Sequence, residues 1–232
     1  MKKLSITKSN ILIKSSYHLS LNELRIVIYG LSFINPTSRD FQLFYEINLK
    51  HFREYFGILS NERGFYGEIK DAVLKKFWER ETTYWDEKNK EVVKRRWLIG
   101  VNYKNTLMKI YFNPLLKDQL QQLKKNFTTY FLSNIVNMKS IYGIRIYELC
   151  IMEFNKKKLD KVFFTITISR LKTYFMLDKK YKRFYDFKNR VLEKAKIEIL
   201  KHSNLEIVYE ILKINNIPLK IRFSAWKKNT NI

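Results

Sequence analysis

The sequence has few residues of the kinds that carry covalent or metal chemistry. Its single cysteine, Cys150, excludes an internal disulfide and any metal site built from several cysteines. Because apolar residues surround Cys150 in the sequence, we expect it to be a small core residue. The three histidines, His18, His51 and His202, are widely spaced, and no His-x-His pair occurs. A metal-dependent tyrosine nickase therefore lacks its ligands, and we expect no metal, no cofactor and no catalytic site.

Glycine and long apolar runs are also scarce. The six glycines form no G-x-x-x-x-G-K-[S/T] motif, which argues against a P-loop ATPase. No apolar stretch approaches the roughly 20 residues that a membrane-spanning helix needs. Residues 1–10 lack the continuous apolar segment of a secretory signal. We therefore expect a protein of the reducing cytoplasm that has no membrane partner.

Acidic residues are few relative to basic ones. The 232 residues include 45 Lys and Arg against 22 Asp and Glu, which gives a net charge of +23. Residues 1–119 hold 21 basic and 13 acidic residues, and residues 120–232 hold 24 and 9. A general bias toward lysine adds bases but does not remove acids from one half of the chain. The excess favours a polyanionic partner, of which nucleic acid is the commonest.

The apolar pattern predicts a mixture of helices and strands around a real core, since 46% of residues are hydrophobic. Ser20 and Glu23 have the spacing of a capping box, so a helix is expected to begin there. The elements expected in the first half are a short arm or strand over 1–18, a helix over 21–34, a strand over 41–49, a short helix over 51–56, a long helix over 65–80, a hairpin over 81–103 and a strand over 107–112. Those expected in the second half are one or two connecting helices over 115–139, a helix over 141–154, a strand over 164–168, a short helix over 170–175, a long helix over 181–200 and a hairpin over 205–223.

The two halves repeat one pattern. Residues 45–58 align with residues 164–177, with apolar side chains at the same positions. Residues 24–26 align with residues 144–146, and the two long helices match in turn. Chance similarity between amphipathic segments explains one such match but not several in the same order. The sequence therefore predicts an internal duplication of one small domain.

Each copy is expected to run helix, strand, short helix, long helix and hairpin, which is the order of a winged helix. We predict an α+β fold with two tandem winged-helix domains, residues 1–118 and 119–232. In such a domain the long helix can enter a DNA major groove and the hairpin forms the wing. The wing of the first copy is expected at the 81–103 hairpin, and the wing tip of the second at residues 213–216. Two such helices in one chain can reach successive major grooves, about 34 Å apart.

The long helix of the second copy has the residue types that read DNA. Its apolar residues mark one buried face. The opposite face carries cations that can reach phosphates or guanine, an Asn that can bond adenine and an Asp that can accept from cytosine N4. For this helix alone, an ordinary charged surface is the alternative. The exposed face is expected to contain Lys182, Arg183, Asp186, Asn189, Arg190 and Lys194.

The segments SN at 9–10, LSLNE at 19–23, YGIRIYEL at 142–149 and YKRFYDFKNRV at 181–191 resemble those of iteron-plasmid replication initiators, theta-type Rep proteins built of two winged helices. The resemblance covers nearly the whole chain. It implies a protein that binds direct repeats, the iterons, at a plasmid origin as a monomer and helps to open nearby AT-rich DNA. It further implies recruitment of the host initiator, helicase and primase. A homodimer formed through the N-terminal domain, in equilibrium with the monomer, is expected to repress its own gene.

The resemblance also assigns site residues. In that family the long helix of the second domain contacts the bases. Here the corresponding residues are Arg183, Asp186, Asn189 and Arg190, with Lys182, Lys188 and Lys194 nearby for phosphates. Asn189 stands where the family usually has Arg, which suggests a different iteron sequence. Contacts to the DNA backbone are expected from Lys70, Lys75, Lys76 and Lys88 of the first domain and from Lys213 at the second wing tip.

Two other classes of function fit parts of the sequence. A winged-helix transcriptional repressor explains the fold and the charge, although such proteins normally carry one domain per chain and dimerise. A nuclease or nickase is the enzyme alternative, because 15 tyrosines leave a tyrosine nucleophile open. No partner set for such a tyrosine is recognisable, so we expect a protein that is not an enzyme.

Overall fold

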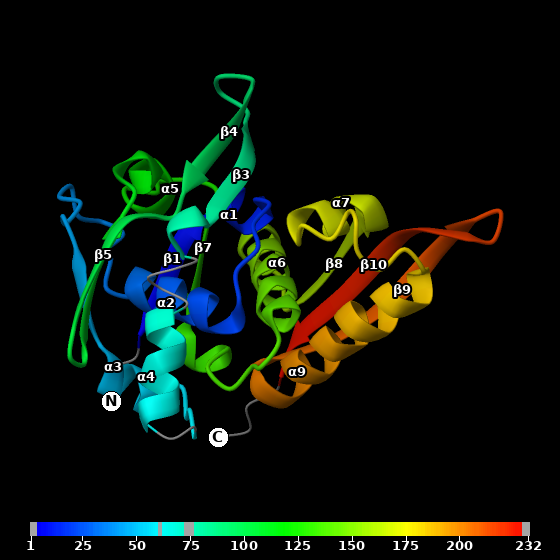
Figure 1. Cartoon of the computed structure of the whole chain (residues 1–232). Coiled ribbons are helices and arrows are strands. Elements are labelled where there is room, and N and C mark those ends of the chain that lie inside the picture. Colours follow the sequence, from blue (N-terminus) through cyan, green and yellow to red (C-terminus); the bar gives the residue numbers. More distant parts are fainter. Residues whose placement is uncertain (1–3, 60–61, 72–76, 229–232) are drawn as a thin grey trace. The chain divides into compact units, whose positions relative to one another are not determined.

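The computed structural model describes residues 4–59, 62–71 and 77–228, and the chain divides into two compact units, Met1–Leu132 and Ser133–Ile232 (Figure 1). The division lies after Leu132 rather than after residue 118 as predicted. The reason is a strand, β7 (Phe127–Phe131), which pairs antiparallel with β1 (Ser5–Ser9) in unit 1. The prediction of one or two connecting helices over 115–139 did not include this strand and was wrong for residues 127–131. The alternating burial of β7, with Thr128 and Tyr130 inside, is the period-two pattern of a strand.

Unit 1 contains most of the elements that were expected of the first half, together with the β1–β7 pair. In chain order they are β1, α1 (Asn10–Lys14), α2 (Leu21–Leu31), β2 (Tyr45–Asn48), α3 (Leu49–Tyr55), α4 (Glu62–Asp71), a 3₁₀ turn (Phe77–Glu79), β3 (Glu81–Asp86), β4 (Glu91–Arg96), β5 (Leu98–Lys104), β6 (Leu107–Phe112), a second 3₁₀ turn (Pro114–Leu116), α5 (Lys117–Leu120) and β7. The expected strand over 41–49 is confined to Tyr45–Asn48.

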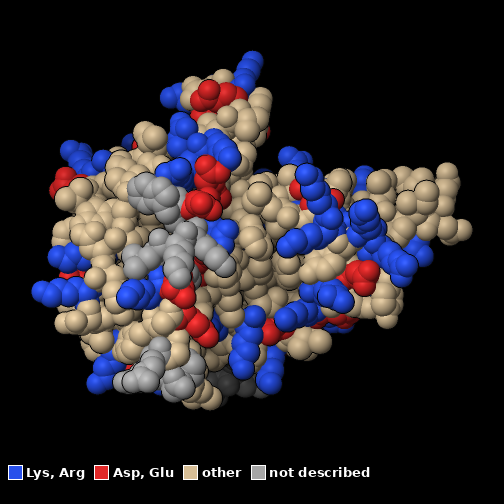
Figure 2. Space-filling view, viewed as in Figure 1, with Lys and Arg blue, Asp and Glu red and all other residues tan. Residues whose placement is uncertain are grey.

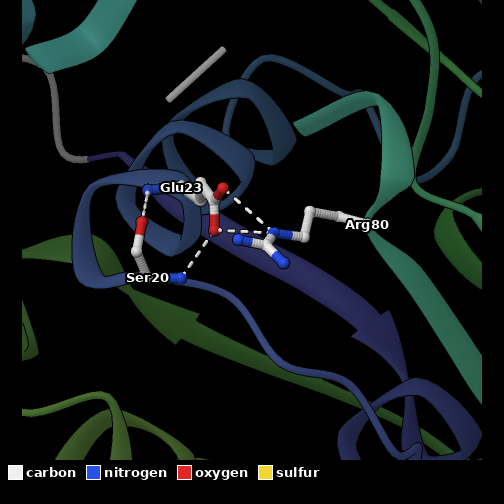
Figure 3. A network of polar contacts seen from close by, with 3 residues as sticks. All are labelled: Ser20, Glu23 and Arg80. Atoms are coloured by element: carbon white, nitrogen blue, oxygen red, sulfur yellow. Dashed lines mark hydrogen bonds and ion pairs between the residues drawn. The ribbon is translucent and has the colours of Figure 1, made fainter. Parts of the chain in front are cut away.

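The predicted capping box begins α2. The Ser20 hydroxyl accepts a hydrogen bond from the backbone N–H of Glu23, and the Glu23 carboxylate accepts one from the backbone N–H of Ser20. The same carboxylate, which is buried, accepts from Arg80 Nε at 3.0 and 3.1 Å (Figure 3). Since Arg80 directly precedes β3, one carboxylate both starts α2 and attaches it to the base of the β3–β4 hairpin.

The wing of unit 1 is not the hairpin that the sequence suggested. β3 and β4 form the expected hairpin, but they make a separate two-stranded sheet. The three-stranded sheet has the order β2-β6-β5, and the corresponding sheet of unit 2 has the order β8-β10-β9. The structural counterpart of the second wing is therefore β5–β6, and β3–β4 is an additional hairpin. Pattern alone could not separate them, because two hairpins follow each other within residues 81–112.

Unit 2 follows the predicted order closely. It contains a 3₁₀ turn (Leu132–Asn134) at its start, α6 (Ile141–Lys157), β8 (Lys161–Thr167), α7 (Ile168–Tyr174), α8 (Phe184–Phe187), a π-helical turn (Lys188–Glu193), α9 (Lys194–His202), β9 (Leu205–Ile214) and β10 (Ile217–Lys227). α6 is buried along most of its length and packs against α9. Cys150 lies fully buried on α6, as expected, and burial raises the pKa of its thiol.

Equivalent contacts in the two units support the duplication. Ser20 and Ser140 cap the first helix of the repeat in the same way. The Arg25 guanidinium lies 5.3 Å from the centre of the Phe56 ring, and that of Arg145 lies 5.1 Å from the Phe175 ring. These pairs fall at the aligned positions of the two sequence copies. The same buried arginine–phenylalanine contact thus joins the first helix to the helix-turn-helix in each unit.

Candidate nucleic-acid interface

The helix-turn-helix of unit 2 consists of α7 and the continuous helical segment Phe184–His202, here called the reading helix. α7 begins where the Thr167 hydroxyl accepts a hydrogen bond from the N–H of Arg170. The connection between the two helices includes two non-glycine residues in the left-handed region, Met176 and Tyr181 (φ 52° and 53°). The turn is therefore tightly specified rather than an open loop.

The reading helix buries the side that the sequence predicted. Phe187, Val191, Ala195 and Ile199 are almost completely buried, whereas Phe184 is only half-buried. Consecutive members of this buried set are four residues apart in the sequence. In a regular α-helix such steps advance about 40° too far each time, so the buried side would rotate away from the core.

A π-helical turn corrects this drift in the middle of the reading helix. The turn spans Lys188–Glu193, and its wider winding returns Val191 and Ala195 to the core side. π turns are rare and occur often at functional sites. The turn contains three of the predicted DNA-contacting residues, Lys188, Asn189 and Arg190. The local widening therefore also sets how these side chains are spaced along the exposed side.

The exposed side of the reading helix carries most of the predicted residues. Asn189, Arg190 and Lys194 are exposed on the helix, Lys182 and Arg183 are exposed directly before it, and Asp186 and Lys188 are half-buried. Figure 2 shows Lys and Arg side chains gathered over the helical region between α7 and α9. None of these cations forms an ion pair within the part of the chain that the structure describes. Most of the side chains that were predicted to meet DNA are thus exposed on the reading helix or in the two residues that precede it.

Three polar contacts fasten the reading helix. At its start, Lys172 Nζ donates to the Tyr181 carbonyl oxygen at 2.9 Å and lies 5.4 Å from the Phe187 ring centre. At its middle, the Tyr209 hydroxyl on β9 donates to Glu193 at 2.5 Å, and burial, followed by this contact, raises the pKa of Tyr209.

Near its end, Glu198 accepts from the backbone N–H of Lys139 at 2.7 Å. These contacts tie the reading helix and the residues before it to α7, to β9 and to the segment before α6.

The remaining predicted residues are distributed over other elements. Lys70 is exposed on α4, the unit 1 counterpart of the reading helix. Lys88 is exposed in the turn between β3 and β4, where Asp86 accepts from its backbone N–H at 2.9 Å. Lys213 is exposed near the end of β9. Lys75 and Lys76 lie outside the described residues.

Several exposed side chains next to these residues were not predicted from the sequence. Tyr185 lies between the predicted contacts Arg183 and Asp186 and is 72% exposed. Its position one turn before Asn189, which was expected on the exposed face, is the signal that could have identified it. Ile214 and Ile217 are exposed at the end of the β9–β10 hairpin. The sequence placed Ile214 in the turn and Ile217 at the start of a strand, and neither was predicted as an exposed contact residue.

The described residues contain no group of three or more His, Cys, Asp or Glu side chains placed to hold a metal ion. Among the same residues, no helix combines the length and apolar character needed to cross a membrane.

Comparison with known proteins shows what the two units are. Residues 5–151 match the family "Initiator Replication protein, WH1", and residues 167–225 match "Initiator Rep protein, WH2". The chain belongs to the initiator replication protein family. The two matches follow each other in the order of the two units, so this initiator family member carries both winged-helix domains, as the sequence predicted.

Two relatives illustrate the similarity. A replication initiation protein of Escherichia coli is 25% identical over 214 residues, which are 90% of this chain and 66% of that protein. The chain therefore spans about two thirds of the length of this curated relative. The crystal structure of the Pi initiator protein in complex with iteron DNA has a TM-score of 0.81 and 19% identity, and the match covers 99% of each chain. At that identity the likeness establishes the fold.

Proposed function

We propose that this initiator family member binds direct repeats at a plasmid replication origin through its two winged-helix units. The observation that carries the proposal is the exposed face of the reading helix. Asn189 and Arg190 are exposed on this helix and Arg183 is exposed directly before it, and the opposite side of the helix is buried. Arginine and asparagine are the side chains that bond guanine and adenine edges bidentately. Binding of iteron DNA by the structurally similar Pi initiator supports the same choice of partner.

The roles proposed for the two units differ. Unit 2 carries the fuller set of base-reading residues, and the second half of the sequence has the larger positive charge. We therefore assign sequence reading mainly to unit 2. Unit 1 is proposed to contact the DNA backbone through lysines such as Lys70 and Lys88, and to form the homodimer. A monomer with two helices in successive major grooves covers roughly 20 base pairs.

The proposal includes the later steps that family membership suggests. The bound monomers help to open adjacent AT-rich DNA and recruit the host initiator, helicase and primase in the cytoplasm, while the dimer represses the protein's own gene. These steps need contacts to DNA and proteins but no bond-making chemistry. We accordingly propose that the chain is not an enzyme.

Footprinting on the DNA that flanks the gene tests the proposal. We expect protection of several direct repeats, each about two helical turns long, beside an AT-rich tract. The mass of a complex with a single repeat, measured by light scattering, should correspond to one chain per repeat. Protection of a single inverted repeat alone would instead indicate a transcriptional repressor. Incubation of supercoiled origin DNA with divalent metal should produce no nicks, and nicking would contradict the assignment of no enzyme activity.

A further inference from the structure

The end of the β9–β10 hairpin is apolar in a way that folding does not explain. From here on, the wing tip means residues 213–220, which include the predicted tip at 213–216 and the first residues of β10. Ile214 and Ile217, which face each other across the strands, are 59% and 68% exposed, and Leu219 is 41% exposed. Figure 2 shows the far end of this hairpin without charged side chains on the visible face. Single exposed apolar residues are common, but three within six positions at a hairpin end suggest a binding partner.

The wing tip projects beyond the three-stranded sheet. β10 begins at Ile217, but its pairing with β8 begins at Lys220, which lies opposite Thr167. Residues 213–219 therefore belong to a two-stranded extension with no third strand beside it. The register shifts between Pro218 and Lys220, so Leu219 is a bulge residue that adds a local bend. The apolar side chains consequently lie at the free end of the hairpin, where they can reach a separate molecule.

The turn at the wing tip is rigid and polar. Asn215 and Asn216 both have positive φ (48° and 64°), which is the conformation of a two-residue type I′ hairpin turn. Glycine is common at the second of these positions. Asparagine adopts the same backbone conformation but adds an amide that can both donate and accept hydrogen bonds. Two amides are thus placed between the two exposed isoleucines.

The charge around the wing tip indicates the kind of partner. Residues 213–220 include no acidic residue, and two exposed cations, Lys213 and Lys220, flank the apolar group. The nearest carboxylate along β9, that of Glu210, is paired with Arg222 at 3.1 Å. A partner that complements this surface carries negative charge on the outside and apolar groups between the charges. Double-stranded DNA has this character, since its stacked bases lie between two phosphate backbones.

We propose that the wing tip enters the minor groove next to the repeat that the reading helix binds, and that Ile214 or Ile217 inserts between base pairs and kinks the duplex. Minor-groove proteins use isoleucine and leucine as such wedges and asparagine and lysine for the groove itself. The Asn215 and Asn216 amides donate to adenine N3 or thymine O2, and the exocyclic amino group of guanine blocks this approach. The inserted step is therefore in A·T-rich sequence, where T–A steps unstack most easily.

This inference rests on the proposed function, because it places the wing on DNA that the reading helix has bound. Its test uses the full chain and one origin repeat with its A·T flank. The double variant Ile214→Ser/Ile217→Ser removes the wedge, and both positions are exposed, so folding should be unchanged. Val208→Ser is the matched control, since Val208 is 43% exposed on β9 outside the wing tip. Thermal unfolding checks that all three proteins are folded.

Three readouts follow the duplex. Fluorescence anisotropy gives the affinity, energy transfer between the duplex ends gives the bend, and permanganate reactivity of thymines reports unstacking. We expect the native protein and Val208→Ser to bend the repeat by roughly 20–90° and to expose thymines at one flanking step. The double variant should still bind but should lose the bend and the reactivity. Ile214→Phe, which keeps a wedge, should retain both.

The possible failures are distinguishable. If the native protein does not bind the repeat, the proposed function fails and the inference fails with it. If the native protein and the double variant bind and bend the duplex equally, the proposed function stands and the inference is overturned. This second result would also be seen if the wing tip contacts a protein rather than DNA. Equal bending of a flank changed from A·T to G·C pairs would overturn the assignment to the minor groove.

Discussion

Replacement of Arg190 by alanine separates base reading from general attraction to DNA. Arg190 is exposed within the π turn and forms no ion pair with the described residues. Alanine is a good helix former, so the free energy of unfolding should change by less than about 0.5 kcal/mol. If Arg190 contacts a base edge bidentately, its loss costs ~1–3 kcal/mol on the cognate repeat. That range corresponds to an affinity lower by roughly 5- to 150-fold.

Two further variants make the result specific. Arg190→Lys keeps the charge but loses the planar pair of donors, so it should lose much of the cognate affinity and keep the affinity for random DNA. Lys156→Ala removes one positive charge from α6, outside the reading helix, and should leave discrimination unchanged. Affinities for cognate and random duplexes are measured by fluorescence anisotropy at one salt concentration. An equal loss on both duplexes for Arg190→Ala would refute the base contact.

Three other predictions concern a proposed DNA contact in unit 1, the ion pair at the start of α2 and the hydrogen bond that holds the reading helix. Lys88→Ala should weaken binding to cognate and random DNA alike and reduce the slope of log affinity against log salt by about 1; an unchanged slope would place this turn away from DNA. Glu23→Ala removes the second capping bond of α2 and leaves Arg80 without its carboxylate, so urea unfolding should show a loss of ~2–4 kcal/mol. A loss below about 1 kcal/mol would mean that this pair contributes little. Tyr209→Phe deletes the hydrogen bond to the reading helix and should lower stability by ~0.5–1.5 kcal/mol and also weaken cognate binding; unchanged binding would show that this tie does not orient the helix.

Most helices and strands of unit 2 could be predicted from the local sequence, because their apolar residues recur with a clear helical or strand period. The reading helix, β8, α7 and the β9–β10 hairpin were all expected close to where they occur. The spacing predicted a buried side made of Phe184, Phe187, Val191, Ala195 and Ile199, and all of these except the half-buried Phe184 are buried. The π turn was not predictable, because it depends on how a helix with three consecutive four-residue steps packs against the rest of unit 2. A periodic pattern states which residues are buried, but not how the backbone adjusts to bury them.

Unit 1 shows where local patterns fail. β7 was read as helix because residues 115–139 have a weak and polar pattern, and its strand character depends on pairing with β1, more than 110 residues away. The β3–β4 hairpin was predicted correctly as a hairpin but given the position of the wing. Only the strand order β2-β6-β5 identifies the true counterpart. Strand neighbours are set by contacts between distant residues, which a single sequence does not display.

The sequence by itself determined that this chain is a basic, duplicated pair of winged-helix domains, because net charge, helix periodicity and repetition are properties of the residue order. It also identified the exposed face of the reading helix. Tertiary structure decided where the units divide, which hairpin is the wing, and that Ile214 and Ile217 lie largely exposed at the end of a hairpin. Exposure depends on what packs against a side chain, and an isoleucine in a strand pattern becomes a candidate DNA wedge only when its sheet ends before it.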